Sequence, residues 1–514
     1  MSLALVQSRA LLGLSAAPVT VEVHLANGLP SFTLVGLADV EVKEARERVR
    51  SAIQNAGLEF PSNKRITVNL APADLPKDSG RFDLPIALGI LAGSGQVDAA
   101  LLAGHEFAGE LSLSGQLRPV RGALAMALAL HDGAGKTRLV LPRESAQEAA
   151  LVPGAIVFGA SHLLDVVAQF RPADAAALEP GPDPGGWSRI EAAAAPTQVR
   201  SHPDLADVKG HAAAKRALEI AAAGQHSLLM VGPPGSGKSM LAQRFAGLLP
   251  AMSVAEALES AAVASLAQRF SLDTWQQRPT ASPHHTSSAV ALVGGGSPPR
   301  PGEISLAHHG VLFLDEFPEF ARSALEALRE PLETGTITVS RAGRRSEFPA
   351  RFQLIAAMNP CPCGYLGATL KPCRCTPDQI ARYQGKLSGP LLDRIDLHVD
   401  VPAIPAQQLL EAPPGESTAA IRQRVEAARR RALARQDKPN QALQGAEIDR
   451  HAALEPAALQ FLHHAASRLG WSARSTHRAL KMARTIADLA GAEQVNVAQV
   501  AEAVQYRRAL QGAG

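Results

Sequence analysis

The chain of 514 residues is poor in aromatic side chains and nearly balanced in charge. Phe, Trp and Tyr make up 4% of it, so a broad platform of rings for stacking single-stranded bases is not expected. The 51 Lys and Arg residues are matched by 48 Asp and Glu residues, which leaves a formal net charge of +3. This balance neither requires nor excludes a nucleic-acid partner, so only local basic patches can argue for one.

Long apolar runs are also missing. The sequence has no uninterrupted apolar stretch of about twenty residues, so a membrane-spanning helix is not expected. The apolar stretch near the amino terminus has no basic segment before it and is interrupted by Gln7, Ser8 and Arg9. That pattern is not typical of a signal peptide. We therefore expect a cytoplasmic protein.

Cysteine is absent from most of the chain, because all four cysteines form two Cys-x-Cys pairs between residues 361 and 375. In a reducing compartment, such a cluster favours metal binding or chemistry over disulfides. Four thiolates suit a tetrahedral Zn²⁺ site, although Cys-x-x-Cys is the commoner zinc spacing. The predicted zinc ligands are Cys361, Cys363, Cys373 and Cys375, and four free thiols in a surface loop are the alternative.

The pattern of the sequence divides the chain into four segments. Residues 1–170 alternate β-type runs with helical stretches, and residues 201–400 do the same, which predicts two α/β units. Residues 171–200 are rich in Pro, Gly and Ala and are expected to form a linker. Residues 401–514 have a helical pattern with one Pro/Gly break.

A glycine-rich turn after residue 231 predicts a nucleotide site. It follows a short apolar strand, precedes a helix and has the pattern G-x-x-x-x-G-K-S. Backbone N–H groups of such a turn surround phosphate oxygens at the positive end of the helix. Lys238 is expected to reach the β- and γ-phosphates of ATP, and Ser239 to bind Mg²⁺. The predicted binding residues are Gly232, Pro233, Pro234, Gly235, Ser236, Gly237, Lys238 and Ser239.

Two further apolar strands end in polar residues. The strand in "GVLFLDEF" ends at Asp315 and Glu316. The first suits the Mg²⁺ shell and the second suits polarising the attacking water, since phosphoryl transfer needs positioning and charge. The strand in "FQLIAAMNP" ends at Asn359, whose amide is expected to orient the water near the γ-phosphate.

These motifs resemble those of the AAA+ ATPases, in particular the magnesium-chelatase-like branch and its ComM/YifB family. The resemblance spans nearly the whole chain, through "VEVHLANGLPSFTLVGL", "VNLAPADLPKDSGRFDLPIALGIL", "PRPGEISLAHHGVLFLDEFPEF" and "LSGPLLDRIDLHVD". It implies a P-loop AAA+ domain with a helical carboxy-terminal lid that uses ATP and Mg²⁺ and assembles as a hexamer. By the same resemblance, Arg394 is the arginine finger that acts on a neighbour's ATP, Arg474 is sensor 2, and Val208 lies near the adenine.

The amino-terminal segment resembles the Lon protease domain, which has the ribosomal-S5-like fold. The stretch "PKDSGRFD" has Arg81 at the position of the protease's nucleophilic serine. Leu124, in "PVRGALAMALALHDGAGKTRLVLP", stands in the place of the dyad lysine. A serine nucleophile needs its hydroxyl and a base, so we expect a catalytically inactive scaffold.

Two insertions are candidate substrate contacts, at residues 282–310 and 334–355. The second is expected to form a β-hairpin with Arg341, Arg344 and Arg345 at its turn. In similar ATPases such hairpins line the central pore of the ring, and arginines suit phosphate contacts. A solvated basic turn is the alternative. The four histidines lack a spaced ligand set, so structural roles are expected for His284, His285, His308 and His309.

The resemblance implies an ATP-driven hexameric DNA motor. The function it suggests is a helicase that acts on single-stranded and branched DNA and promotes branch migration during natural transformation. The alternative is the motor subunit of a magnesium–porphyrin chelatase, which the Lon-like domain and the cysteine stretch argue against. A Lon-type protease is a third hypothesis, opposed by Arg81 and Leu124.

Overall fold

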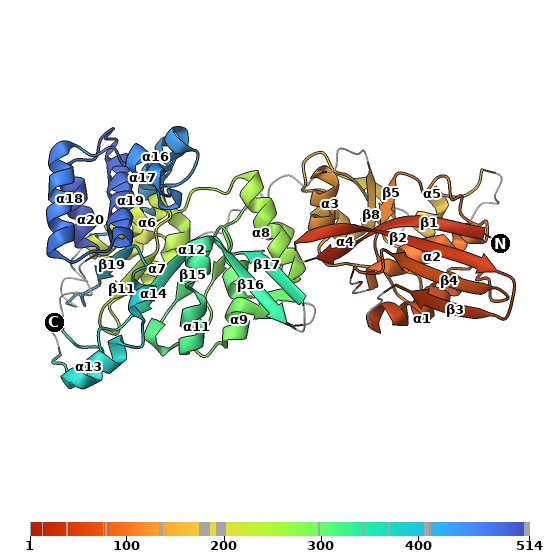
Figure 1. The fold of residues 1–514 in the computed structure, drawn as a ribbon, viewed down its shortest axis with the longest axis horizontal. Helices are drawn as coiled ribbons and strands as arrows, with labels where there is room; N and C mark the ends of the chain where they lie inside the picture. Colours follow the sequence, from red (N-terminus) through yellow and green to blue (C-terminus); the bar gives the residue numbers. More distant parts are fainter. Residues whose placement is uncertain are drawn as a thin grey trace.

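A computed structural model describes residues 2–507 except 13, 37–39, 76, 78–79, 133–136, 174–185, 192–201, 297–298, 342–343, 369–370, 406–410 and 412. Two lobes lie along the long axis of the molecule (Figure 1). The amino-terminal lobe, red to orange, is at one end, and the remainder of the chain, green to blue, is at the other. Within the described residues, every helix is too short or too polar to cross a bilayer.

The amino-terminal lobe is built on an eight-stranded mixed sheet. Buried and exposed residues alternate along its two long strands, as expected where one face of a sheet meets a core. Helix α2 (Asp83–Gly93) packs on β1 and β2, and α1 (Val40–Asn55) packs on α2. The sheet order is β10-β9-β8-β5-β1-β2-β4-β3, and its strands are β1 (Ser2–Leu12), β2 (Ser15–Ala26), β3 (Ser31–Val35), β4 (Arg65–Ala71), β5 (His105–Phe107), β8 (Arg138–Pro142), β9 (Ile156–Ala160) and β10 (Trp187–Ile190).

Part of the segment expected to be a linker belongs to this sheet. Strand β10 pairs antiparallel with β9, with Trp187 opposite Ala160. The ring of Trp187 stacks on that of Phe158 with their centroids 5.1 Å apart. Four residues within a Pro/Gly/Ala-rich stretch give too short a pattern to predict a strand, so the expectation of a linker over 171–200 is wrong at residues 187–190. Residues 174–185 and 192–200 lie outside the described part of the chain.

The second lobe contains a five-stranded parallel sheet. Its order is β12-β15-β18-β11-β19, so β18 separates the strand of the glycine-rich turn from the strand of the acidic pair. Every residue of β11, β15 and β18 is buried, as expected for a parallel sheet covered on both faces. All the carboxyl ends meet at one edge. The strands are β11 (Leu228–Val231), β12 (Thr280–Ala281), β15 (Val311–Leu314), β18 (Gln353–Met358) and β19 (Leu397–Asp400).

Helices surround this sheet and form the carboxy-terminal end of the chain. The predicted α/β fold followed by helices is confirmed, and one core joins α6 to the carboxy-terminal helices at the upper left of Figure 1. The helices of the second lobe that matter below are α6 (Ala212–Gly224), α7 (Lys238–Phe245), α8 (Val254–Leu266), α9 (Ala289–Val293), α10 (Glu303–Leu306), α11 (Arg322–Ala327), α12 (Pro331–Thr334), α13 (Pro377–Gln384), α14 (Gly389–Leu392), α16 (Thr418–Gln436), α17 (Ala446–Ala452), α18 (Pro456–Arg468), α19 (Ala473–Ala490) and α20 (Val497–Gln505).

The predicted β-hairpin is confirmed. Strands β16 (Thr336–Arg341) and β17 (Arg344–Pro349) pair antiparallel, with Arg341 opposite Arg344 and Ser340 opposite Arg345. In Figure 1 the hairpin extends from the second lobe toward the first. The side chains of Arg341, Arg344 and Arg345 lie outside the described part of the structure, so only their backbone positions are known.

The two lobes share an apolar core where α8 packs on α3 (Ala123–Asp132) of the amino-terminal lobe. Leu124 is 1% exposed in this core, close to residues of α8 such as Leu258. The hydroxyl of Ser265 also donates to the carboxylate of Glu148 across the interface, at 2.8 Å. Leu124 therefore has a packing role at the position where a protease would have lysine.

Candidate active site

A cavity of about 690 Å³ lies at the carboxyl edge of the parallel sheet. Ligands of open α/β sheets bind at this edge, where loops after the strands meet. The cavity brings together residues from three separate parts of the sequence. Those predicted from the sequence are Pro234, Gly235, Ser236, Gly237, Lys238, Ser239, Asp315, Glu316 and Asn359.

Lys238 begins helix α7 and is held at the mouth of the glycine-rich loop. The preceding residue, Gly237, has a φ of 90°, a left-handed conformation that favours glycine. The ammonium group of Lys238 donates to the carbonyl oxygens of Gly232 at 2.7 Å and Pro233 at 2.9 Å, and to Oδ1 of Asn359 at 3.2 Å. Burial lowers the pKa of Lys238. Gly232 and Pro233 thus contribute backbone carbonyls that hold the lysine.

Ser239 and Asp315 form a ready pair of oxygen ligands. The hydroxyl of Ser239 donates to Oδ2 of Asp315 at 2.6 Å. The other carboxylate oxygen of Asp315 accepts the backbone N–H of Glu316 at 2.9 Å. A hydroxyl and a carboxylate are oxygen ligands of the kind that Mg²⁺ prefers beside substrate phosphates.

Glu316 has a strained backbone and a partner that the sequence analysis missed. Its φ of 52° places a non-glycine residue in the left-handed region, and such strain concentrates at functional sites. Its carboxylate lies 2.9 Å from Nδ1 of His285. His284 and His285 both line the cavity, whereas the sequence predicted only structural roles for them. They follow β12, a strand of two residues that is too short to reveal which sheet edge they would reach.

The second histidine pair has structural contacts. His308 and His309 direct Nε2 to the same Glu259 oxygen, at 3.0 and 2.8 Å. The backbone N–H of Arg351 donates to Nδ1 of His308 at 3.0 Å, so Nε2 must carry the proton and donate to Glu259. A protonated Nε2 has no lone pair for a metal. This arrangement is consistent with the structural role expected for His308 and His309.

Arg394 and Arg474 lie together, but neither is among the described residues that line the cavity. Both guanidinium groups pair with Glu333 on α12. The hydrogen bond from Arg394, with the charges of both arginines, lowers the pKa of Glu333. The structure therefore brings the predicted arginine finger and sensor 2 to one site, separate from the nucleotide cavity of the same chain.

Helix α19 fixes the segment that carries Arg394. Ser475 donates to Oδ1 of Asp393 at 2.8 Å. Arg478 donates to Oδ1 of Asp396 at 2.6 Å and to the carbonyl oxygen of Arg394 at 2.8 Å. The carboxylates on either side of Arg394 thus bind the helix that carries Arg474.

Val208 does not reach the cavity in this structure. Its side chain is 4% exposed and belongs to the core beneath α6. Its carbonyl oxygen accepts a hydrogen bond from Lys215. The predicted contact between Val208 and adenine therefore stays a prediction.

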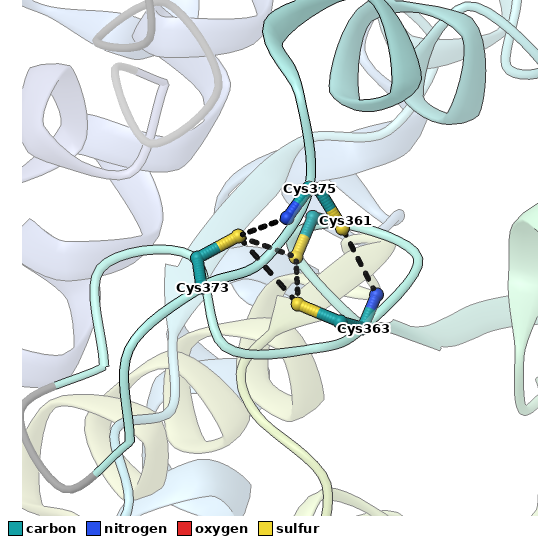
Figure 2. Close-up of side chains that lie close together, drawn as sticks. All are labelled: Cys361, Cys363, Cys373 and Cys375. Atoms are coloured by element: carbon teal, nitrogen blue, oxygen red, sulfur yellow. Dashed lines mark hydrogen bonds between the residues drawn. The ribbon is translucent and has the colours of Figure 1, made fainter.

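The four cysteines converge in the loop between Asn359 and α13 (Figure 2). We call residues 360–376 the cysteine loop. The Sγ atoms of Cys361 and Cys363 are 3.4 Å apart and lie 3.7 and 3.5 Å from that of Cys373. All four Sγ atoms lie within 4.8 Å of one another. A Zn–S bond of about 2.3 Å places the sulfurs of a tetrahedron about 3.8 Å apart, so the set has the dimensions of a zinc site.

Backbone N–H groups point at the sulfurs. The N–H of Cys363 donates to Sγ of Cys375, and the N–H of Cys375 donates to Sγ of Cys373, each at 3.4 Å. Backbone hydrogen bonds from Arg374 and Tyr365 lower the pKa of Cys363 to about 6. The pKa of Cys375 is raised to about 12 despite its bond from Cys363, because burial and the neighbouring thiols disfavour more negative charge. A cation among the sulfurs would reverse that penalty.

Comparisons with known proteins place the chain in a family. Models of magnesium chelatase match most of it: "Magnesium chelatase, subunit ChlI" over residues 204–409, "Subunit ChlI of Mg-chelatase" over 21–145, and "Magnesium chelatase, subunit ChlI C-terminal" over 415–507. The chain is 27% identical over 229 residues to the DNA replication licensing factor Mcm2 of Drosophila melanogaster, which covers 42% of this chain and 21% of that protein.

Two bacterial relatives match from end to end. Competence protein ComM of Haemophilus influenzae is 50% identical over 509 residues, which is 99% of this chain and 98% of that protein. YifB of Salmonella typhimurium is 49% identical over 510 residues, which is 99% of this chain and 97% of that protein. The chain therefore belongs to the ComM/YifB family of magnesium-chelatase-like AAA+ proteins.

Proposed function

We propose that the protein is an ATP-hydrolysing motor that moves DNA, with its ATP site in the cavity at the carboxyl edge of the parallel sheet. As a member of its family the chain is an AAA+ ATPase of the ComM type. The observation that carries the proposal is the convergence of Lys238, Ser239, Asp315, Glu316 and Asn359 on one cavity. Family membership supports the ATPase, and the geometry supports the role of each residue in it.

Each residue has a role in hydrolysis that follows from its position. Lys238, held by loop carbonyls, binds the β- and γ-phosphates. Ser239 and Asp315 hold Mg²⁺, which supplies positive charge to the phosphates. Glu316 polarises the attacking water, and Asn359 orients it beside the lysine to which its amide is bonded.

The arginines favour an assembly of several copies. Arg394 and Arg474 share Glu333 and lie outside the cavity of their own chain. Because α19 ties them into one unit, both would reach the ATP of a neighbouring subunit together. A ring, and specifically a homo-hexamer, supplies each cavity with such a neighbour, and a transition-state arginine is worth roughly 10³–10⁵ in rate.

The hairpin β16–β17 is the proposed DNA contact. Its paired positions place Arg341, Arg344 and Arg345 beside the turn. Arginines there would bind the phosphate backbone, which repeats in every DNA sequence. Competence is the printed function of one full-length relative, and DNA replication that of the distant one. We therefore propose a helicase that acts on single-stranded and branched DNA and promotes branch migration during natural transformation.

The test is ATP-dependent unwinding of forked and four-way DNA, with Glu316→Gln as the inactive control. We expect the parent to unwind these substrates and its ATPase to rise when DNA is added. A parent that hydrolyses ATP but neither binds DNA nor responds to it would overturn the DNA-motor proposal and leave the ATPase standing.

A chelatase motor subunit is the second candidate. All three family models carry that description, and one covers residues 21–145. The amino-terminal lobe therefore does not count against this candidate, contrary to the expectation from sequence. Stimulation of Mg²⁺ insertion into a porphyrin by partner subunits, without any response to DNA, would favour it.

The cysteine loop is proposed to hold one Zn²⁺ per chain. The sulfur separations and the N–H groups directed at them support Cys361, Cys363, Cys373 and Cys375 as the ligands. Elemental analysis of protein purified without chelator tests this, with Cys361→Ser as the comparison. Absence of stoichiometric metal in the parent would return the loop to four free thiols.

The amino-terminal lobe is proposed to be a Lon-like domain without protease activity. Arg81 and Leu124, at the positions of the nucleophile and the dyad lysine, are each 1% exposed. Neither side chain is placed to attack a peptide. ATP-dependent cleavage of casein that survives in Arg81→Ala would contradict this part of the proposal.

A further inference from the structure

The cysteine loop touches the glycine-rich loop directly. Gly364, between the second cysteine and Tyr365, has a φ of +82°. A Cβ atom at Gly364 would lie 2.4 Å from Cδ and 2.7 Å from Cγ of Pro234. Pro234 lines the ATP cavity. The cysteine loop is therefore seated against the wall of the nucleotide site, and the contact leaves no room for a side chain at residue 364.

The far end of the loop reaches the same site by a second route. Thr376, next to Cys375, caps α13 with a capping box. Near the end of this helix, Gln384 donates to the carbonyl oxygen of Pro360 at 3.0 Å. Tyr383, which is 7% exposed, makes a backbone hydrogen bond with Asn359. Asn359 is the residue whose amide oxygen accepts from Lys238.

The cysteines join these two routes. Cys361 and Cys363 stand beside Asn359 and Gly364, and Cys373 and Cys375 stand beside α13. The sulfur contacts connect the two pairs across the loop. A loop of this size cannot bury a core of its own, so a metal or sulfur cluster sets its shape.

We infer that the cysteine loop is a positioning part of the ATP site: through Gly364 on Pro234 and through α13 on Asn359, an intact cysteine cluster holds the glycine-rich loop and Asn359 in place for ATP. This inference rests on the proposed ATPase function. Gly364 acts through Pro234 and is a positioning residue, as is Tyr383 through Asn359.

The first experiment compares Gly364→Ala with Gly367→Ala. Both glycines have positive φ, +82° and +73°, but among the described residues nothing lies within 4 Å of a Cβ at Gly367. The two variants therefore impose the same backbone strain, and only the first pushes on Pro234. We expect Gly364→Ala to weaken ATP binding by about tenfold, as overpacking does, and to raise KM more than it lowers kcat. Gly367→Ala should bind ATP like the parent, and both should keep four thiols and the parent's metal content.

A double-mutant cycle isolates the contact. Pro234→Ala removes the Cγ and Cδ atoms that an alanine at 364 would meet. In that background Gly364→Ala should cost little further ATP affinity, since the two changes act through one contact. Additive losses, or equal ATP affinities for Gly364→Ala and Gly367→Ala in a parent that binds ATP, would overturn the inference. A parent that does not bind ATP would instead overturn the proposed function.

Removal of the metal from the unmutated protein gives a measurement that does not depend on how any variant folds. Binding of a fluorescent ATP analogue is followed while a chelator strips the cluster and Zn²⁺ is then restored. We expect affinity to fall with the metal and to return with it. Unchanged affinity after all four thiols have become titratable would overturn the inference.

Discussion

The two lobes use charged side chains in opposite ways. In the amino-terminal lobe, Arg48 and Asp83 pair at 2.7 Å with the carboxylate fully buried. Arg9 and Glu106 also pair at 2.7 Å, with side chains 12% and 11% exposed. In the second lobe, Glu316 is 56% exposed beside the cavity and Arg474 is 46% exposed at the surface. Charges closed within the chain serve the fold, and charges left half open remain available to a ligand or a neighbour.

This difference shows that a buried charge is not by itself a sign of chemistry. Arg81 and Asp83 are both buried in the amino-terminal lobe, in the stretch that resembles a protease site. The candidate active site instead collects groups from three strand ends around one cavity. What marks the functional lobe is convergence on open space.

The largest effect is expected from Arg394, because it tests whether the open charges act between subunits. Arg394→Ala should keep ATP binding and lower hydrolysis by roughly 10³–10⁵, the usual value of a transition-state arginine. Turnover and binding of a fluorescent nucleotide measure the two separately. Mixing Arg394→Ala with Glu316→Gln subunits should restore activity at sites that combine one intact half from each. If exchanging mixtures never regain activity, the assignment in trans fails.

The buried pair of the amino-terminal lobe should give the largest loss of stability. Arg48→Ala leaves the Asp83 carboxylate buried with only its backbone bond from Leu111. Breaking one side of such a pair costs about 3–5 kcal/mol of unfolding free energy. Denaturant unfolding measures the loss, and ATP affinity should stay at the parent value because the cavity is in the other lobe. A large loss of ATP affinity without loss of stability would break the comparison between the lobes.

Asp83 should also give the lobe a dependence on pH. Burial raises the pKa of Asp83 to about 6, above its ordinary value. The folded chain therefore holds this proton more tightly than the unfolded chain, so the contribution to stability is present below about pH 4 and is lost as the pH rises through about 6. Asp83→Asn should flatten the change in melting temperature across this window. An identical slope in parent and variant would show that Asp83 is not the group responsible.

The sequence predicted the elements with long patterns and missed those with short ones. The glycine-rich turn, the acidic pair and Asn359 each follow a buried strand of at least four residues, and the structure brings them together. Strand β12 has two residues and β10 has four, so neither the place of His285 nor the pairing of Trp187 could be inferred. The shared contact of Arg394 and Arg474 with Glu333 joins positions 61 and 141 residues from it, which spacing along the chain does not reveal.

The hairpin should give an intermediate effect on DNA and little on ATP. Replacing Arg341, Arg344 and Arg345 with alanine removes three proposed phosphate contacts, so the salt dependence of DNA binding should fall by about 0.9 per contact. DNA affinity and DNA-stimulated ATPase should fall together, while basal ATPase remains because the cavity residues are unchanged. Titrations at several salt concentrations measure this. Normal unwinding by the triple variant would remove the hairpin from the DNA path.

The smallest effect is expected from His285, and it tests whether Glu316 needs a partner to act. The carboxylate of Glu316 is 56% exposed and lies 2.9 Å from Nδ1 of His285. Without that partner it would rotate more freely and spend less time aimed at the water, so His285→Ala should lower kcat by about tenfold at most. KM for ATP should stay unchanged, because Lys238 and the glycine-rich loop are untouched. The matched control is His284→Ala, a neighbour in the same cavity whose Nδ1 lies 2.9 Å from the hydroxyl of Thr286 and which should hydrolyse ATP like the parent. Steady-state ATPase assays of the two variants decide the matter: equal rates, or faster hydrolysis in His285→Ala, would mean that the open carboxylate of Glu316 needs no orientation from within its own chain.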